Sequence, residues 1–288
     1  WSVVPLLSPA QPSRTEVVDL VAAPGATYSG TWDGVSPQGQ GVQTWSDGAR
    51  YEGQFVNGKA HGSGKFFHAG GDIYDGQWQD DQAHGIGIYK HCDGSVYRGS
   101  WVADKQEGEG TEDWPDGAKY VGLYRQSCKH GFGKFIWADR SVFEGQFQDN
   151  DISGEGIYTW GDGRRYEGTW LKNKMHGKGL FMWTDGRSYT GDYVHDHKEG
   201  VGVFKWTDGR EYAGQWLQGK QDGVGIYTTA KGKKRKGEWS QGRRVSWLDG
   251  EGEQDEERPE EPPKQEDQMP EIPGPTPEEA NDNAPPNP

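Results

Sequence analysis

The apolar positions of this chain are mainly aromatic rings that alternate with polar residues and glycine, in a pattern that repeats every 23 residues from position 28 to 234. Each repeat is counted here from its first aromatic residue. Rings recur at repeat position 5 in all nine repeats and at position 16 in seven. This alternation lacks helical spacing, and a strict short period is typical of stacked units, so the pattern predicts a series of β-hairpins. The repeats begin at Tyr28, Tyr51, Tyr74, Tyr97, Tyr120, Phe143, Tyr166, Tyr189 and Tyr212, and a partial tenth begins at Arg235.

Two turns are predicted in each repeat. Asp-Gly occupies repeat positions 20–21 in six repeats, as in Asp185-Gly186, which predicts a three-residue loop with glycine in the left-handed conformation. The pair changes at Asp139-Arg140, Gly70-Gly71 and Lys231-Gly232, which leaves the geometry of those turns open. A four-residue loop at positions 7–10 would then pair position 5 with 12, 3 with 14 and 1 with 16.

Glycine is invariant at repeat positions 3, 12 and 14 in the nine repeats. In the predicted register, positions 3 and 14 form a bare row between walls of rings, and position 12 leaves room for the ring at position 5. The opposite face would be largely solvated. We therefore expect an all-β, elongated, single-layer antiparallel sheet with an aromatic groove, and a large exposed aromatic surface normally marks a binding site. The predicted partner-binding groove comprises Trp78, Trp101, Tyr124, Phe147, Trp170 and Tyr193.

The repeat resembles a known family. The pattern Tyr-x-Gly-x-Trp-x-x-(Gly/Asn)-Lys-x-His-Gly-x-Gly-x-Phe-x-Trp-x-Asp-Gly, best seen from Tyr166 to Gly186, is similar to the MORN repeat (membrane occupation and recognition nexus). The resemblance implies a hairpin-repeat sheet without catalytic residues, used as a scaffold, a membrane–cytoskeleton linker or an appendage of an enzyme. Repeats followed by an acidic tail resemble the radial-spoke-head MORN proteins of cilia.

Composition divides the chain into three parts. Residues 250–288 hold 13 acidic and two basic residues, a net charge of −11, and 10 of the 16 prolines, which predicts a disordered acidic tail. The remaining charge is −14 minus −11, or −3, so net charge gives no reason to expect nucleic-acid binding by the repeats. We expect an N-terminal extension or cap over 1–27, the repeat array over 28–249 and the tail over 250–288. A short capping strand is predicted near Val17–Val21.

The repeat contains no residue pattern that is typical of a catalytic or metal site. The histidines before the position-12 glycine (His61, His84, His130 and His176) recur two strands apart, about 9–10 Å, which is too far for one zinc ion. No nucleophile–base set or paired carboxylates stand out, so we expect no enzyme, no cofactor and no metal. An accessory role in a larger enzyme would require that the chain be a fragment.

Cations gather in two places. Arg164, Arg187 and Arg210 lie at position 22, paired in the predicted register with Trp160, Trp183 and Trp206, which predicts a cation–π ladder. A basic cluster near the end of the array has three readings: contact with the acidic tail, docking on an anionic membrane, or a nucleic-acid or nuclear-import signal. This basic cluster comprises Lys231, Lys233, Lys234, Arg235, Lys236, Arg243 and Arg244.

These patterns favour a non-enzymatic scaffold that binds protein partners in a larger assembly, cytoskeletal or ciliary. The alternative is a peripheral linker to anionic membranes through residues 231–244. Open sheet edges could also support end-to-end self-association. We expect a cytoplasmic location, or an organellar one if the start at Trp1 reflects removal of a leader.

Overall fold

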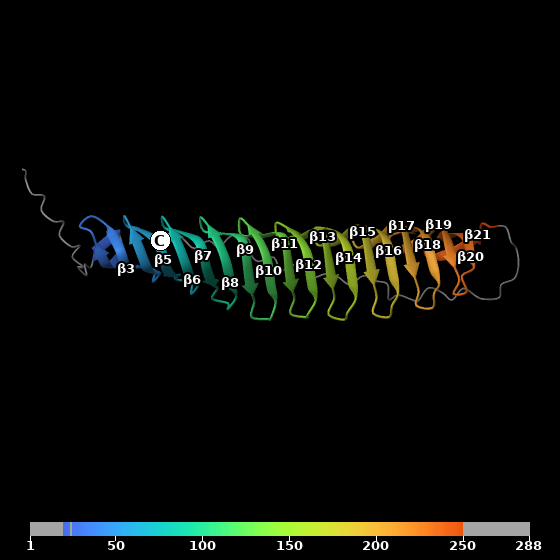
Figure 1. Ribbon diagram of the computed structural model, residues 1–288, viewed down its shortest axis with the longest axis horizontal. Helices are drawn as coiled ribbons and strands as arrows, with labels where there is room; N and C mark the ends of the chain where they lie inside the picture. The colour runs from blue at the N-terminus through green and yellow to red at the C-terminus, as the bar shows by residue number, and fades with distance from the viewer. Residues whose placement is uncertain (1–19, 24, 250–288) are drawn as a thin grey trace, which may run out of the picture. The chain divides into compact units, whose positions relative to one another are not determined.

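The structure is a computed structural model that describes residues 20–23 and 25–249, where every regular element is a strand (Figure 1). The predicted disordered tail and most of the N-terminal extension, Val17 included, lie outside these residues. The strands are β1 (Leu20–Ala23), β2 (Ala26–Trp32), β3 (Pro37–Trp45), β4 (Arg50–Val56), β5 (Lys59–Phe67), β6 (Ile73–Gln79), β7 (Gln82–Lys90), β8 (Val96–Val102), β9 (Lys105–Asp113), β10 (Lys119–Arg125), β11 (Cys128–Ile136), β12 (Val142–Gln148), β13 (Asp151–Thr159), β14 (Arg165–Leu171), β15 (Lys174–Met182), β16 (Ser188–Val194), β17 (His197–Lys205), β18 (Glu211–Leu217), β19 (Lys220–Thr228), β20 (Lys234–Ser240) and β21 (Arg243–Trp247).

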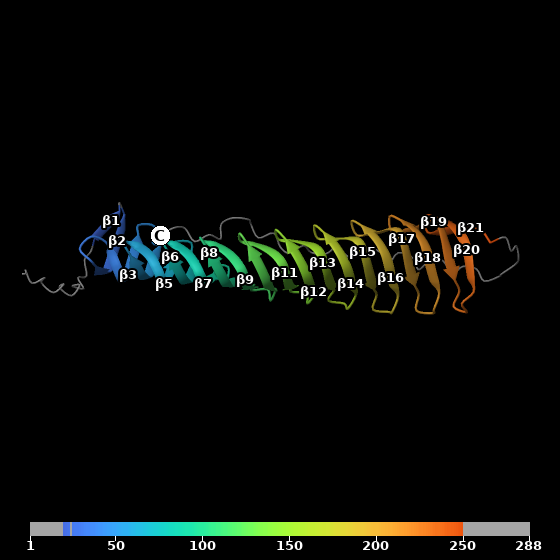
Figure 2. The same ribbon diagram turned by 45° about the horizontal axis from the view of Figure 1, so that its top comes forward.

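The described chain divides into two compact units. One contains β1–β9 with residues 124–127, and the other contains residues 116–123 with β11–β21. Within each unit the strands form an antiparallel sheet in which neighbours in sequence are neighbours in space, as β14 and β15 are in Figures 1 and 2. The predicted all-β hairpin-repeat fold is confirmed.

The predicted register is correct at the centre of each hairpin. Gly168 at repeat position 3 pairs with Gly179 at position 14, and Tyr166 at position 1 pairs with Phe181 at position 16. The same rows continue between repeats, where Gly156 pairs with Gly168. Because side chains alternate between the two faces of a strand, this register gathers the rings on one face, as expected.

The three-residue loop at positions 19–21 also has the predicted geometry. In the loop that follows Trp160, the nitrogen of Gly163 donates to the Trp160 carbonyl at 2.9 Å, and Gly163 has a φ of 93°. Arg140 occupies the glycine position one repeat earlier, yet its nitrogen makes the equivalent bond to Trp137 at 2.9 Å with a φ of 69°. The departure from Asp-Gly therefore leaves the turn unchanged and places a non-glycine residue in a strained region.

The prediction for the other turn is wrong. The loop has two residues, at positions 7–8, and in repeat 6 these are Asp149 and Asn150, with φ of 51° and 73°. Two successive left-handed residues form the tight turn that matches strand twist, so position 5 pairs with 10 rather than 12, as Trp170 does with Met175. Positions 11–13 then form a bulge opposite position 4.

Glycine at position 12 serves this bulge rather than the ring at position 5. Gly62 has a φ of 66°, and a Cβ there would collide with the side chain of Gln54 at position 4. The Oε1 of Gln54 accepts a hydrogen bond from the nitrogen of Ser63 at 2.9 Å, which closes the bulge. Gln77, Gln146 and Gln215 make the same bond in their repeats.

Candidate functional site

The tyrosine at position 1 explains the other two glycine rows. The Tyr166 ring lies along its own strand, and its hydroxyl donates to the Thr169 carbonyl at 3.1 Å. A Cβ on Gly179 would lie 2.5 Å from Cζ of this ring, and one on Gly168 would lie 2.7 Å from its hydroxyl. The ring therefore rests directly on the two glycines, as predicted. Phe143 occupies the same place but lacks the hydroxyl.

Each tyrosine also bridges two repeats. The Tyr166 ring meets Trp170 edge-on at 5.0 Å and Tyr193 of the next repeat at 5.2 Å. The indole nitrogen of Trp170 donates to the Gly156 carbonyl of the preceding repeat at 3.2 Å. Aromatic pairs of this geometry each contribute about 0.5–1.5 kcal/mol beyond area burial, so neighbouring repeats stabilise one another.

The six rings predicted to line an open groove are buried, and this expectation is wrong. Their side chains are only 1–3 % exposed; they are Trp78, Trp101, Tyr124, Phe147, Trp170 and Tyr193. The rings tip over the glycine row and cover one another, and position-10 side chains such as Ile152 and Met175 are fully buried with them. The aromatic face therefore forms the core of the described residues, and these six rings offer no surface to a partner.

This core contains charged side chains to which the sequence analysis assigned no role. Lys198 at position 10 is buried, and its Nζ lies 4.9 Å from the Trp183 ring centre and 5.1 Å from that of Phe204. Glu112 replaces the ring at position 16 and accepts a hydrogen bond from the Tyr124 hydroxyl at 2.9 Å. The sequence signal for Glu112 was a charged residue at position 16, where seven repeats carry a ring, whereas position 10 gave little signal for Lys198 because Gln106, Lys129 and Gln221 also occupy it. Both side chains are held by the core and are closed to ligands.

The outer face, expected to be largely solvated, carries exposed apolar side chains. In the fifth repeat, Phe132 is 63 % exposed, Val121 45 % and Leu123 39 %. Leu123 covers Gly131, next to Phe132, with its Cδ1 3.1 Å from the place where a Cβ would lie. We call Val121, Leu123 and Phe132 the outer apolar cluster. Its sequence signal was phenylalanine at position 13, where most repeats carry a polar residue.

A shallow polar trough lies on the outer face of the N-terminal unit. Its volume is about 710 Å³, and mainly polar side chains line it beside half-buried glycine backbone. Lys65 and Asp75 form an ion pair across it at 3.6 Å. The lining side chains are Ser29, Gln40, Val42, Glu52, Ser63, Lys65 and Asp75.

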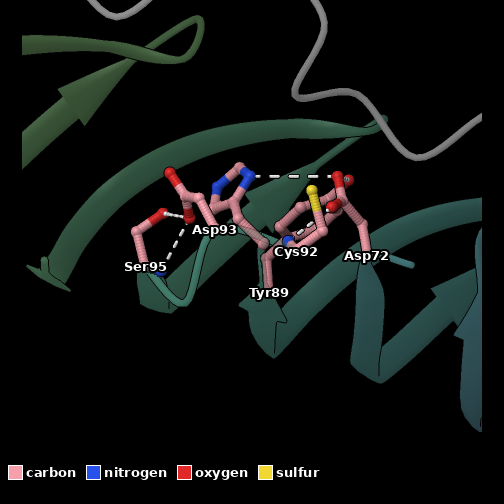
Figure 3. A network of polar contacts seen from close by, with 6 residues as sticks. Asp72, Tyr89, Cys92, Asp93 and Ser95 are labelled. Atoms are coloured by element: carbon pink, nitrogen blue, oxygen red, sulfur yellow. Dashed lines mark hydrogen bonds and ion pairs between the residues drawn. The ribbon is translucent and has the colours of Figure 1, made fainter. Parts of the chain in front are cut away.

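The second and third repeats depart from the pattern at one edge, where histidine replaces tryptophan at position 18. Asp72 accepts hydrogen bonds from the Tyr89 hydroxyl and the Cys92 nitrogen, both at 2.8 Å, and lies 3.9 Å from His91 (Figure 3). Burial raises the pKa of Asp72, but these contacts outweigh it and leave the pKa below its usual value. Burial lowers the pKa of His68, against the opposing effect of Asp72. The network ties two neighbouring turns together.

The basic cluster lies at the end of the array, and all its members are exposed except Arg235, which is partly buried. Arg235 pairs with Asp249 at 3.4 Å, and Arg235 and Arg244 both lie 4.2 Å from the centre of the Trp247 ring. Burial and the charge of Arg235 lower the pKa of Arg244. The sequence thus located a cationic surface, although two of its arginines stack on a ring.

The predicted cation–π ladder is confirmed. The guanidinium carbons of Arg164, Arg187 and Arg210 lie 5.9, 5.5 and 5.5 Å from the ring centres of Trp160, Trp183 and Trp206. Each guanidinium is also held by the aspartate of its own turn, as Arg187 is by Asp185 at 2.6 Å. This geometry gives the arginines a structural role in the turns.

Residues 20–23 and 25–249 make up the described part of the chain. No group of three or more His, Cys, Asp or Glu side chains there could hold a metal ion. The same stretch contains no helix long and apolar enough to span a membrane.

Comparison with known proteins places the repeat in a family. No curated protein matches the chain. The TCP10 domain of Danio rerio CPAP has a TM-score of 0.40 at 13 % identity, covering 71 % of this chain and 96 % of that one. The TCP domain of Drosophila melanogaster SAS-4, in complex with a proline-rich motif of Ana2, has a TM-score of 0.31 at 11 % identity, covering 74 % and 99 %. These values support no conclusion about function.

The MORN repeat profile matches nine segments: 28–50, 51–73, 74–96, 97–119, 120–142, 143–164, 166–186, 189–209 and 212–234. The matches begin where the aromatic period begins and together cover most of the chain. They agree with the hairpins, the glycine rows and the ring at position 5 described above. The chain therefore belongs to the MORN repeat family.

Proposed function

We propose that this protein is a non-enzymatic scaffold that binds a partner protein on the outer face of its sheet, centred on the outer apolar cluster. The observation that carries the proposal is the exposure of Phe132 beside Val121 and Leu123. Aromatic side chains are strong anchors in protein interfaces, because a partner pocket can take the whole ring out of water. Membership of a repeat family commonly used as a scaffold supports the same reading.

The partner's chemistry follows from this surface. Phe132 and Leu123 are apolar, and the cross-strand pair Lys134–Glu144 beside them is an ion pair at 3.3 Å. A segment with an apolar pocket or side chain at its centre and polar residues around it would complement such a surface. A cytoskeletal or ciliary assembly stays a prediction from the layout of repeats and tail.

The test compares two variants that add one positive charge at the same repeat position. Phe132→Lys alters the outer apolar cluster, and Ser63→Lys alters position 13 of the second repeat. Affinity purification from the native source should lose the partner with Phe132→Lys and keep it with Ser63→Lys. Equal recovery with both variants, with circular dichroism unchanged, would contradict the proposal.

The basic cluster supports a second candidate, a peripheral contact with anionic membranes. The specific observation is that Lys231, Lys234, Lys236 and Arg243 are all exposed at one end of the array. Each basic residue near an anionic surface contributes about 1 kcal/mol. Flotation with vesicles of phosphatidylserine and phosphatidylcholine tests it: binding should fall with salt and with glutamine at 231, 234 and 236. Binding that ignores both changes would exclude this candidate.

Self-association through the last strand is a further prediction. β21 has five residues and is the last described strand of its unit, and it carries Arg243 and Arg244, which oppose edge-to-edge pairing. Light scattering of the whole chain and of a chain without residues 243–247 distinguishes self-association through this strand from a monomer. A concentration-dependent mass that persists without this strand would argue against pairing at this edge.

A further inference from the structure

A second exposed apolar surface lies on the outer face of the last repeats. Val203 on β17, Ala213 on β18 and Ile226 on β19 are successive cross-strand partners in one row. Ile226 is 44 % exposed and Val201 beside this row is 61 % exposed, whereas Val203 and Ala213 are half-buried. We call Val203, Ala213 and Ile226 the C-terminal row. Partly exposed aliphatic side chains on adjacent strands favour an occupant that covers them.

The chain leaves the last hairpin beside this row. Lys236 is the cross-strand partner of Ile226. Its carbonyl accepts a hydrogen bond from the Leu248 nitrogen at 2.8 Å, and its nitrogen donates to Asp249 at 3.1 Å. Asp249 is the last described residue and also pairs with Arg235. The last described residue therefore lies near the C-terminal row, and its carboxylate contacts Arg235 and Lys236 of the basic cluster.

The following 39 residues have a composition that suits this surface. They carry a net charge of −11, and nine of their 13 acidic residues lie between positions 251 and 267. Apart from alanine, their only aliphatic or thioether side chains are Met269 and Ile272, each directly before a proline. Along the chain, the acidic stretch follows Asp249 directly and could reach the basic cluster, and Met269 and Ile272 come after it.

The spacing of that pair matches the spacing of the row. In the polyproline II helix, which proline-rich sequences favour, the rise is about 3.1 Å per residue and residues three apart lie on one side about 9 Å apart; Met269 and Ile272 are three apart in sequence. Val203 and Ile226 lie two strands apart, also about 9–10 Å. A segment crossing the strands could place one apolar side chain over each.

The chain is long enough for Met269 and Ile272 to reach the C-terminal row. Nineteen residues, 250–268, separate Asp249 from Met269. A flexible linker of that length has an end-to-end distance of about 24 Å, which exceeds the few strand spacings to be crossed. Tethering also raises the local concentration of the segment to about the millimolar range, so that modest contacts suffice.

From these observations we propose that residues 268–273 of the same chain dock across the C-terminal row, guided by attraction between the acidic stretch 251–267 and the basic cluster. The docked segment covers the aliphatic side chains and occupies the cationic end, so that an anionic partner must displace it. The proposal concerns a different surface from the outer apolar cluster and does not depend on it.

Photo-cross-linking in the full chain tests this docking. p-Benzoylphenylalanine placed at Ile272 should cross-link within the same molecule to peptides from β17–β20. The same group placed at Ala284 is the control and should not. Ile226→Asp should reduce the cross-link yield about tenfold, as expected when an aliphatic contact is lost. Met269→Ser should also reduce it and cannot disturb the repeats, which separates loss of docking from misfolding.

Several outcomes would overturn the proposal. Cross-links spread evenly over the repeats, or equal yields from positions 272 and 284, would show that the segment has no preferred site. Cross-linked dimers at low protein concentration would make a second copy the occupant. An unchanged yield in 1 M salt, where the Debye length falls to about 3 Å, would remove the role of the basic cluster.

Discussion

Replacing Gly179 by alanine should destabilise the protein strongly, although the same change stabilises many proteins. A Cβ there would lie 2.5 Å from Cζ of Tyr166, a buried ring between Gly168 and Gly179. Displacing the ring would break its hydrogen bond to Thr169 and its edge-on contacts with Trp170 and Tyr193. One hydrogen bond, two aromatic pairs and the burial of one ring suggest a cost of about 3–5 kcal/mol, against the gain of about 0.4–1 kcal/mol usual for Gly→Ala.

The assay is equilibrium unfolding in urea followed by circular dichroism, with hydrogen exchange of β14 and β15 amides as the local measurement. Gly70→Ala is the matched control, because nothing lies within 4 Å of a Cβ at Gly70. In a Tyr166→Ala background, the cost of Gly179→Ala should fall below about 1 kcal/mol. If the cost persists without the tyrosine ring, or if Gly179→Ala behaves like Gly70→Ala, the account of the glycine rows is refuted.

Three further predictions follow from single positions. Phe143→Tyr should restore the missing hydroxyl bond to the carbonyl of Gln146 and raise stability by about 0.5–1.5 kcal/mol in urea unfolding; a loss of stability would show that the hydroxyl does not fit. Arg140→Gly should raise the melting temperature, because it removes about 1 kcal/mol of left-handed strain, and no change would mean that Arg140 is unstrained. Burial raises the pKa of Tyr158 and Tyr212 to about 12. Since an unfolded tyrosine ionises near pH 10, stability should be complete below pH 10 and fall between about pH 10 and 12; tyrosinate absorbance of these residues near pH 10 in folded protein would contradict this.

The pairing of positions 1 with 16 and 3 with 14 was predicted correctly from the sequence, because two different turns give the same pairing. A four-residue loop, or a two-residue turn followed by a bulge, uses the same number of residues between positions 3 and 14. Repeat 2 carries Asn57-Gly58 at the turn, a sequence signal for the two-residue loop, but repeat 6 has Asp149 and Asn150 there, which adopt positive φ without a glycine. The choice depends on whether the position-4 side chain can close the bulge, a contact that becomes visible only in three dimensions.

The same limit explains the error at the groove. The sequence placed Trp101 and Trp170 on the correct face, but whether that face is open depends on how far each ring tips over the glycines and how the bulge bends the hairpin. A single-layer sheet can therefore have a buried core, when large side chains on one face cover a central row of glycines. The apolar residue at Phe132 was visible in the sequence, yet its exposure in the structure is what distinguishes it from a core side chain.

The contacts between rings join residues of the same repeat or of the next one, as Tyr28 contacts Phe55, 27 positions later. During synthesis, each tyrosine can therefore meet its partner soon after it leaves the ribosome. At about 5–20 residues per second, the wait is roughly 1–5 s. No aromatic face has to stay uncovered until a distant part of the chain is made, and such low contact order favours fast folding. A sequence rich in tryptophan and tyrosine can thus emerge as a nascent chain with little exposure to aggregation.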